Sequence, residues 1–208
     1  MRGAPITVAI LAGGAASRLG GRDKGLEPLR GRPLVAHVVD AIAAMAGADP
    51  PGGAILSADP AALLIVANRN RESYARHART VGDDAPGFRG PLAGVATALG
   101  ACAGTWLMTV PVDCPDPPRD LAARLLAAAL RDDAPCVVAH DGERRQPLFA
   151  LYRPRLAGSA AAAVAAGRGV RQWQDTIPAR ELDFSDRRRQ FRNLNTADDF
   201  AAHAADQT

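Results

Sequence analysis

The chain has 208 residues, 48% of them hydrophobic and 23% charged, a globular composition that excludes wholesale disorder. Its 25 basic and 22 acidic residues leave a net charge of +3, which is too small to indicate nucleic-acid binding. No apolar run is long enough for a transmembrane helix, and we expect no signal peptide. The three cysteines form no CxxC pair. We therefore expect a cytoplasmic protein without disulfides or a zinc site.

Hydrophobic patterning over the first two thirds of the chain predicts strands that alternate with helices. The expected strands, each a short apolar run, are residues 6–11, 63–67, 80–81 and 106–110. The expected helices are residues 33–45, 71–78, 90–101 and 118–131. The glycine-rich residues 13–31 and the proline- and glycine-rich residues 49–60 are interpreted as loops.

The last third of the chain has a more mixed pattern. Its expected strands are residues 136–139, 147–152, 182–184 and 191–194, and a helix is expected over residues 155–166. The sequence Thr196-Ala-Asp-Asp199 has the spacing of a capping box and predicts a terminal helix that continues to Ala205.

The alternation of strands and helices predicts the fold class. Strands separated by helices form a mainly parallel sheet with helices on both faces, here a single Rossmann-like, three-layer α/β/α domain. Ligands of such sheets bind beyond the carboxyl ends of the strands. Three charged features follow expected strands: the loop of residues 13–24, the pair Asp83-Asp84, and Asp113. We therefore expect the active site where these three features meet.

The glycine-rich loop is the strongest candidate for a phosphate-binding site. Glycines let the backbone approach a ligand, and successive amide groups can form an anion-binding concavity to which Arg18 and Lys24 add charge. Lys24 is the only lysine of the chain, and a compact ammonium suits a crowded phosphate site. The loop contains neither GxGxxG nor GxxxxGK[ST], which disfavours the two commoner nucleotide motifs. The alternative is a flexible surface loop.

Asp113 is the candidate metal ligand. A carboxylate just past a buried strand can hold Mg²⁺, which takes one or two carboxylates together with waters and substrate phosphates. The alternative is an aspartate that shapes the turn before Pro115. Asp83 has the same logic with weaker support. No HExxH or GxSxG motif occurs, so neither a histidine metal site nor nucleophilic catalysis is indicated.

A run of three arginines, residues 187–189, is interpreted as a solvated face of the protein. Phosphate or partner binding is the alternative interpretation.

Several motifs occur in the same order as in a known family. They are Leu11-Ala-Gly-Gly14, Gly20-Gly-Arg-Asp-Lys24-Gly25, Gly31-Arg-Pro-Leu34, Asn68-Arg69, Gly90-Pro-Leu-Ala-Gly94, Pro111-Val-Asp-Cys-Pro115, Asp141-Gly142, Gln146-Pro147, Asp183-Phe-Ser-Asp186 and Asn193-Leu-Asn-Thr196. Over nearly the whole chain this set resembles the molybdenum cofactor guanylyltransferases, a branch of the nucleotidyltransferase superfamily. One position departs from the pattern: Val66 stands where family members often carry an asparagine that contributes to GTP binding.

The resemblance implies an activity, which is transfer of GMP from GTP to the phosphate of molybdenum-molybdopterin, with Mg²⁺ and release of pyrophosphate. It implies GTP binding by eight residues: Leu11, Ala12, Gly13, Gly14, Arg18, Lys24, Asp83 and Asp113. Among these, Lys24 and Asp113 would be catalytic, and Asp113 would also bind the metal. Asn193 and Asn195 would lie on the acceptor side. The nucleotide-binding half would span residues 1–115 and the acceptor half residues 116–208.

The resemblance also bears on partners and alternatives. The expected small-molecule partners are GTP and the molybdopterin cofactor, with transient contacts to cofactor-insertion proteins or molybdoenzymes, and with neither nucleic acid nor membrane. One alternative is a related nucleotidyltransferase with another base or acceptor, such as cytidylyl transfer to molybdopterin or to a sugar phosphate. The other is a non-catalytic nucleotide-binding regulator on the same fold.

Overall fold

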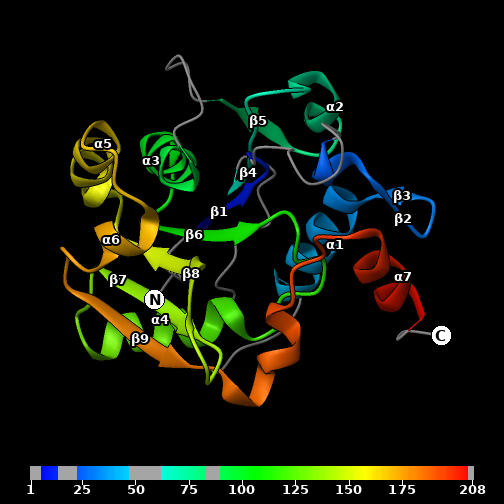
Figure 1. Cartoon of the computed structure of the whole chain (residues 1–208). Coiled ribbons are helices and arrows are strands. Elements are labelled where there is room, and N and C mark those ends of the chain that lie inside the picture. Colours follow the sequence, from blue (N-terminus) through cyan, green and yellow to red (C-terminus); the bar gives the residue numbers. More distant parts are fainter. Residues whose placement is uncertain (1–5, 14–22, 47–61, 83–89, 206–208) are drawn as a thin grey trace.

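The computed structural model describes residues 6–13, 23–46, 62–82 and 90–205, and it is built around a seven-stranded sheet (Figure 1). The strand order is β5-β4-β1-β6-β8-β7-β9. The strands are β1 (Ile6–Leu11), β4 (Leu63–Val66), β5 (Arg79–Val81), β6 (Trp106–Pro111), β7 (Cys136–His140), β8 (Arg145–Tyr152) and β9 (Ala179–Asp183). Every neighbouring pair is parallel except those of β8, which is antiparallel to both β6 and β7. The predicted mainly parallel sheet is confirmed.

Helices cover both faces of this sheet, as the sequence predicts. They are α1 (Leu34–Ala46), α2 (Arg71–Ala75), α3 (Pro91–Ala101), α4 (Leu121–Arg131), α5 (Ala157–Ala165) and α6 (Val170–Gln174). The last helix, α7 (Ala197–Ala205), packs instead against Leu29, Leu34 and Leu194. Buried side chains of α1, α2 and α4 belong to one apolar cluster, and those of α3, α5 and α6 belong to a second cluster. Figure 1 shows α3, α5 and α6 together on one side of the sheet. The three-layer α/β/α architecture is therefore confirmed.

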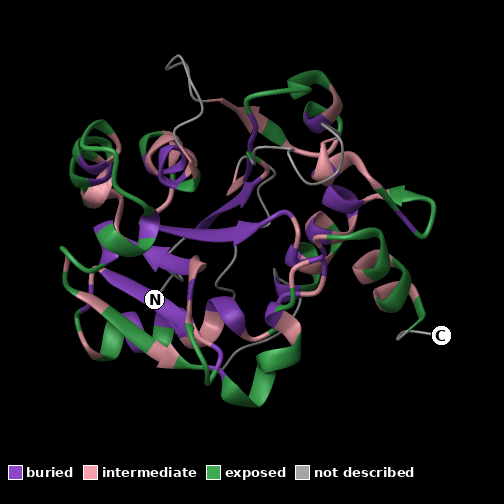
Figure 2. Cartoon of the chain, viewed as in Figure 1, coloured by how far each residue is buried: buried purple, intermediate pink, exposed green. Residues whose placement is uncertain are grey.

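The central strand β1 shows why the sheet can be covered on both faces. Its side chains alternate between the two clusters: Ile6, Val8 and Ile10 lie in the first, and Ala9 and Leu11 lie in the second. All six residues of β1 are buried (Figure 2). A strand that is buried on both faces is a continuous apolar run rather than an alternation of polar and apolar residues, which is what the sequence ITVAIL contains.

A small hairpin not predicted from the sequence precedes α1. It pairs β2 (Pro28–Leu29) with β3 (Arg32–Pro33) in antiparallel fashion. The two turn residues, Arg30 and Gly31, both have positive φ angles, 49° and 74°, as a two-residue hairpin of this hand requires. From the sequence, Gly31 alone indicated a turn here. Arg30 gave no such indication, because arginine rarely adopts a positive φ angle.

The expected strand at residues 191–194 is wrong. Residues Ser185–Phe191 form a 3₁₀ helix, η5, and the next residues run past the end of β6 without joining the sheet. There the amide of Leu194 donates to the carbonyl of Asp113 at 2.8 Å, a single bond rather than a ladder. Phe191 packs edge-on against Phe149 and Phe184 instead. The short apolar run resembles a strand in sequence, but its apolar side chains are buried by packing against other elements rather than in the sheet.

Helix boundaries show smaller differences. Helix α4 begins at Leu121 rather than at residue 118, and α2 ends at Ala75 rather than at residue 78. The short helix α6 was not predicted. The capping box is confirmed: the amide of Asp199 donates to Thr196 Oγ1 at 3.1 Å, and the amide of Thr196 donates to Asp199 Oδ2 at 2.9 Å. The loop expected at residues 49–60 lies outside the described residues. None of the described helices has the length and apolarity needed to cross a membrane.

Candidate active site

The candidate site lies at the carboxyl edge of the sheet, between β1 and β6. The next strand of this sheet after β1 in the sequence is β4, which lies on one side of β1, whereas β6 is its neighbour on the other side. This is the topological switch point at which open α/β sheets bind ligands. The pairing of Leu11 with Pro111, and a 3.1 Å bond from the amide of Val112 to the carbonyl of Leu11, continue to the ends of both strands. The segments that follow β1 and β6 therefore emerge side by side.

Lys24 and Asp113 meet at this edge. The Nζ atom of Lys24 lies 3.1 Å from Oδ2 of Asp113, and it donates a 2.6 Å hydrogen bond to Oδ1 of Asn195. The Lys24 side chain is carried by the 3₁₀ helix η2 (Lys24–Leu26), and Asn195 immediately precedes the capping residue of α7. Three segments that are distant in the sequence thus converge on one ammonium group.

The carboxylate of Asp113 has one oxygen committed to Lys24 and one oxygen without a partner. Its Oδ1 atom is buried, and no hydrogen-bond partner for it exists among the described residues. A carboxylate oxygen that lacks a hydrogen-bond partner fits a hard divalent cation, which prefers oxygen ligands. Within the described ranges no group of three or more histidine, cysteine, aspartate or glutamate side chains gathers as a metal site. A cation here would therefore take protein oxygen from Asp113 and further ligands from substrate and water.

A pocket lies at the ends of β1 and β4 and at the start of α3. Its lining residues are Leu11, Gly13, Val66, Asn68, Gly90, Pro91, Ala93 and Gly94. At Gly94 a Cβ atom would lie 3.5 Å from Leu11 and 3.6 Å from Val66, so helix α3 packs closely against the sheet there. Val66, which stands where the family often has asparagine, is buried and lines this pocket with hydrocarbon.

The other predicted site residues are distributed as follows. Leu11, Ala12 and Gly13 follow one another at the carboxyl end of β1. Asn193 Oδ1 is buried without a partner in the described part of the chain, and only Asn195 of the two asparagines contacts Lys24. Three predicted residues lie outside the described residues, namely Gly14, Arg18 and Asp83.

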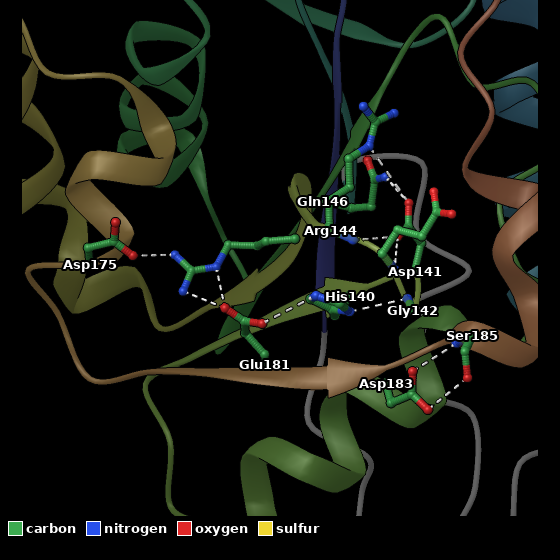
Figure 3. Close-up of polar contacts among 11 residues, drawn as sticks. His140, Asp141, Gly142, Arg144, Gln146, Asp175, Glu181, Asp183 and Ser185 are labelled. Carbon is green, nitrogen blue, oxygen red and sulfur yellow. Dashed lines mark hydrogen bonds and ion pairs between the residues drawn. The ribbon is translucent and has the colours of Figure 1, made fainter.

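A polar cluster occupies the same edge of the sheet at β7, β8 and β9 (Figure 3). The buried carboxylate of Asp141 accepts bonds from the amides of Glu143 and Arg144 and from the side chain of Gln146, at 2.9, 2.8 and 2.5 Å. Burial alone would raise the pKa of Asp141, but these hydrogen bonds outweigh it and the pKa is lowered. Asp141 therefore stays charged and fixes the turn between β7 and β8.

Two of the three arginines at residues 187–189 form ion pairs with acidic side chains. Arg187 lies 3.5 Å from Asp120, and Arg188 is paired with Glu143. These contacts support the interpretation of the run as a solvated face, and no specific observation supports phosphate binding by it.

The thiol of Cys114, adjacent to Asp113, contacts the carbonyl of Gln190, and burial raises the pKa of this thiol. A raised pKa is the opposite of what a nucleophilic cysteine needs.

Asp23, Asn70 and Tyr74 also belong to the surroundings of Lys24, although sequence reasoning gave them no role. The carboxylate of Asp23 accepts from both Asn70 and Tyr74. The available signal was the position of Asn70 and Tyr74 shortly after a buried strand, at the same edge as the glycine-rich loop.

A glycine-rich segment after the first strand, a lysine and a carboxylate at the switch point define a nucleotide-binding α/β protein of the nucleotidyltransferase class. Comparison with known proteins narrows this class. The family model described as MobA-like NTP transferase domain matches residues 8–182. The chain therefore belongs to the MobA-like NTP transferase family.

Individual relatives agree with this assignment. The chain is 40% identical to the molybdenum cofactor guanylyltransferase of Shewanella loihica over 193 residues, which are 92% of this chain and 91% of the relative. It is 39% identical to the molybdenum cofactor guanylyltransferase of Vibrio cholerae over 197 residues, 94% and 90% of the two chains. Among solved structures, molybdopterin-guanine dinucleotide biosynthesis protein A of Archaeoglobus fulgidus superposes with a TM-score of 0.75 at 19% identity, covering 97% of this chain and 99% of the other. At that identity the structural likeness concerns the fold alone.

Proposed function

We propose that this protein is a molybdenum cofactor guanylyltransferase, which transfers GMP from GTP to the phosphate of molybdenum-molybdopterin. The products are the guanine dinucleotide form of the cofactor and pyrophosphate. The observation that carries the proposal is the contact between Lys24 and Asp113, with one Asp113 oxygen unpartnered, at the switch point of the sheet. Its support from comparison is about 40% identity to guanylyltransferases over more than nine tenths of the chain.

The reaction needs no histidine or serine. An oxygen of the acceptor phosphate monoester forms a bond to the α-phosphorus of GTP, and the bond from that phosphorus to the bridging oxygen of pyrophosphate breaks. The attacking oxygen is already anionic near neutral pH, so catalysis consists of in-line positioning and neutralisation of phosphate charge. The Lys24 ammonium would supply a preorganised positive charge for the phosphates.

The residues present also fit a divalent metal, for which we propose Mg²⁺. Asp113 would hold it through the unpartnered Oδ1 atom, and the remaining ligands would be triphosphate oxygens and water. Bound there, Mg²⁺ would neutralise charge on the phosphates. The proposed role of Asp113 is to anchor the cation at the end of β6 while its other oxygen orients Lys24.

The GTP site would comprise the residues after β1 and the opening of α3. Leu11, Ala12 and Gly13 present backbone groups next to the pocket whose other wall includes Gly90 and Gly94. Gly14, Arg18, Lys24, Asp83 and Asp113 complete the proposed GTP-binding set. The valine side chain at position 66 has no polar atom. Hydrogen bonds to the nucleotide would therefore come from the other residues that line this pocket.

The acceptor would approach from the side of residues 193–195. Asn195 supports this proposal because it contacts Lys24 at 2.6 Å, so that a group bound beside Asn195 lies close to the proposed phosphate site. Asn193, whose buried Oδ1 has no partner among the described residues, is the second proposed acceptor residue.

The decisive experiment measures pyrophosphate release from each of the four nucleoside triphosphates, with and without molybdenum-molybdopterin. We expect release from GTP only, and only when the acceptor is present. Preferred turnover of CTP would instead indicate a cytidylyltransferase. Binding of GTP without release of pyrophosphate in the presence of acceptor would indicate a nucleotide-binding regulator.

A further inference from the structure

Asp23, the residue before Lys24, has both carboxylate oxygens occupied. Its Oδ1 atom accepts from the amide of Gly25 at 3.2 Å and from the hydroxyl of Tyr74 at 2.5 Å. Its Oδ2 atom accepts from the side-chain amide of Asn70 at 3.0 Å. Asp23 therefore caps the 3₁₀ turn that carries Lys24, and two side chains from the region after β4 hold Asp23 in turn.

The backbone next to Lys24 is also held by close packing. At Gly25 a Cβ atom would clash with the hydroxyl of Tyr74 and would lie 3.0 Å from a methyl group of Val112. Tyr74 is fully buried, and burial together with the neighbouring Asp23 raises the pKa of its hydroxyl, which therefore remains a donor. The turn is thus held between α2 on one side and the end of β6 on the other.

These contacts constrain where the Lys24 side chain can start. The main chain at residues 23–25 is tied to Tyr74, Asn70 and Val112, while the Nζ atom reaches Asp113 and Asn195. On a freely moving loop, the ammonium group of a long lysine side chain would occupy many different positions. Anchoring the backbone reduces this spread, which is how supporting residues preorganise a functional group.

We propose that Tyr74 and Asn70 are positioning residues for Lys24, acting through their hydrogen bonds to Asp23. Neither residue needs to touch a substrate. Their function is to hold the turn so that the Lys24 ammonium meets the phosphates of the bound nucleotide. This inference rests on the function proposed above for Lys24.

The sharpest test exchanges donor and acceptor between residues 70 and 23. Asn70→Asp places a second carboxylate against Asp23, and the like charges repel each other. Adding Asp23→Asn restores a donor–acceptor pair with the roles reversed, and aspartate tolerates the positive φ of 51° at residue 70. Tyr74→Phe removes one hydroxyl and keeps the ring. Tyr152→Phe is the matched control, because Tyr152 is also fully buried and its hydroxyl bonds to Gln174, away from this turn.

We expect kcat for pyrophosphate release at saturating GTP to fall roughly 10-fold to 100-fold in Asn70→Asp and in Tyr74→Phe. The double variant Asn70→Asp with Asp23→Asn should recover most of this loss, and Tyr152→Phe should keep kcat within about twofold. If Tyr74→Phe does not fold, the variants at residues 70 and 23 decide the question. Normal kcat in a folded Asn70→Asp variant, or no recovery in the double variant, would overturn the proposal.

Hydrogen exchange of the peptide that contains residues 23–27 separates this inference from the proposed function. We expect faster exchange in Asn70→Asp and restored protection in the double variant, whether or not the reaction has been assigned correctly. A wild-type protein that releases no pyrophosphate would refute the proposed function alone. Unchanged exchange in Asn70→Asp would refute the anchor.

Discussion

Lys24 and Asp113 are 89 positions apart in the sequence, yet their charged atoms lie 3.1 Å apart with side chains 25% and 20% exposed. A partly exposed ion pair of this kind stabilises a protein by about 1 kcal/mol or less. A buried oxygen such as Asp113 Oδ1, which has no partner among the described residues, costs about 1–3 kcal/mol. The cost of the unpartnered oxygen thus exceeds the stabilisation from the ion pair, so the arrangement does not serve stability. Such a net cost is typical of a ligand-binding site.

Replacing the lysine tests the role of its charge. We expect Lys24→Ala to fold normally and to lower the rate of pyrophosphate release by ~10²–10³, because one preorganised charge is lost. Lys24→Arg should recover little activity, since a planar guanidinium fits a site shaped for an ammonium poorly. Arg155→Ala is the control, because Arg155 is an exposed cation that follows the antiparallel strand β8 and so lies at the opposite edge of the sheet. Near-normal turnover of Lys24→Ala at saturating GTP would contradict the assignment.

Asp113→Asn tests the proposed metal ligand. The amide keeps the shape of the side chain but removes the anionic anchor for the cation. We expect almost no activity at ordinary Mg²⁺, with partial recovery when Mg²⁺ or Mn²⁺ is raised, measured as rate against metal concentration. The control Asp133→Asn changes an exposed carboxylate in the turn before β7. A wild-type rate with an unchanged Mg²⁺ dependence would show instead that Asp113 shapes a turn, and would leave Asp83 or Asp84 as candidates.

At the scale of elements, polar side chains link strands β8 and β9 to each other and to the end of α6. Arg145 of β8 donates to Glu181 of β9 at 2.7 Å and to Asp175, just after α6, at 2.5 Å (Figure 3). Strand β9 is one of the two edge strands of the described sheet and pairs there with β7, so these charged contacts add a second attachment for an edge strand. Charged side chains on an edge strand also discourage pairing with another chain.

The lowered pKa of Asp141 predicts a pH dependence of stability. Because the folded state favours its carboxylate, this group stabilises the fold above its unfolded pKa of about 4, and the contribution is lost as pH falls through the lower, folded pKa. We expect Asp141→Asn to be less stable at neutral pH, and its free energy of unfolding to fall less than that of the wild type between about pH 5 and pH 2. Denaturant unfolding at several pH values measures this difference.

At the scale of the whole molecule, the two halves proposed to bind the nucleotide and the acceptor share one sheet and one core. Strand β6 of the proposed nucleotide half pairs with β8 of the proposed acceptor half, and the larger apolar cluster contains Ile6 and Val110 as well as Phe149 and Leu151. Cutting the chain after residue 115 would expose an unpaired edge of β6 and half of that core. The proposed division into halves would therefore be a division of function rather than of folding.

This shared core predicts a single cooperative unfolding transition. The two tryptophans report on each half separately, because Trp106 lies in β6 and Trp173 in α6, and both are fully buried. We expect the fluorescence of Trp106→Phe and of Trp173→Phe to show midpoints that coincide with the loss of circular dichroism in the same variant. Two separated midpoints would show that the halves are independent domains.

Some features of this protein follow from local sequence alone. The apolar run at residues 6–11, the face of α1 formed by Leu34, Val38, Ile42 and Met45, and the Thr196 capping box depend on spacing within one segment. A buried strand or an amphipathic helix carries that spacing in its own residues, so the layered α/β fold was predictable. The glycine-rich loop and Asp113 were recognisable as candidates because they follow buried strands.

Contacts between segments that are far apart in the sequence could not be predicted and are known from the folded protein. The sequence contains no signal that Asn195 reaches Lys24 over 171 positions, that Tyr74 holds Asp23, or that residues 192–195 run past Asp113 instead of forming a strand. Such contacts depend on which strands are neighbours and on where each chain segment leaves the sheet. The physical reason is that propensity and periodicity act over a few residues, whereas the site is assembled by packing between segments that meet only when the whole sheet has formed.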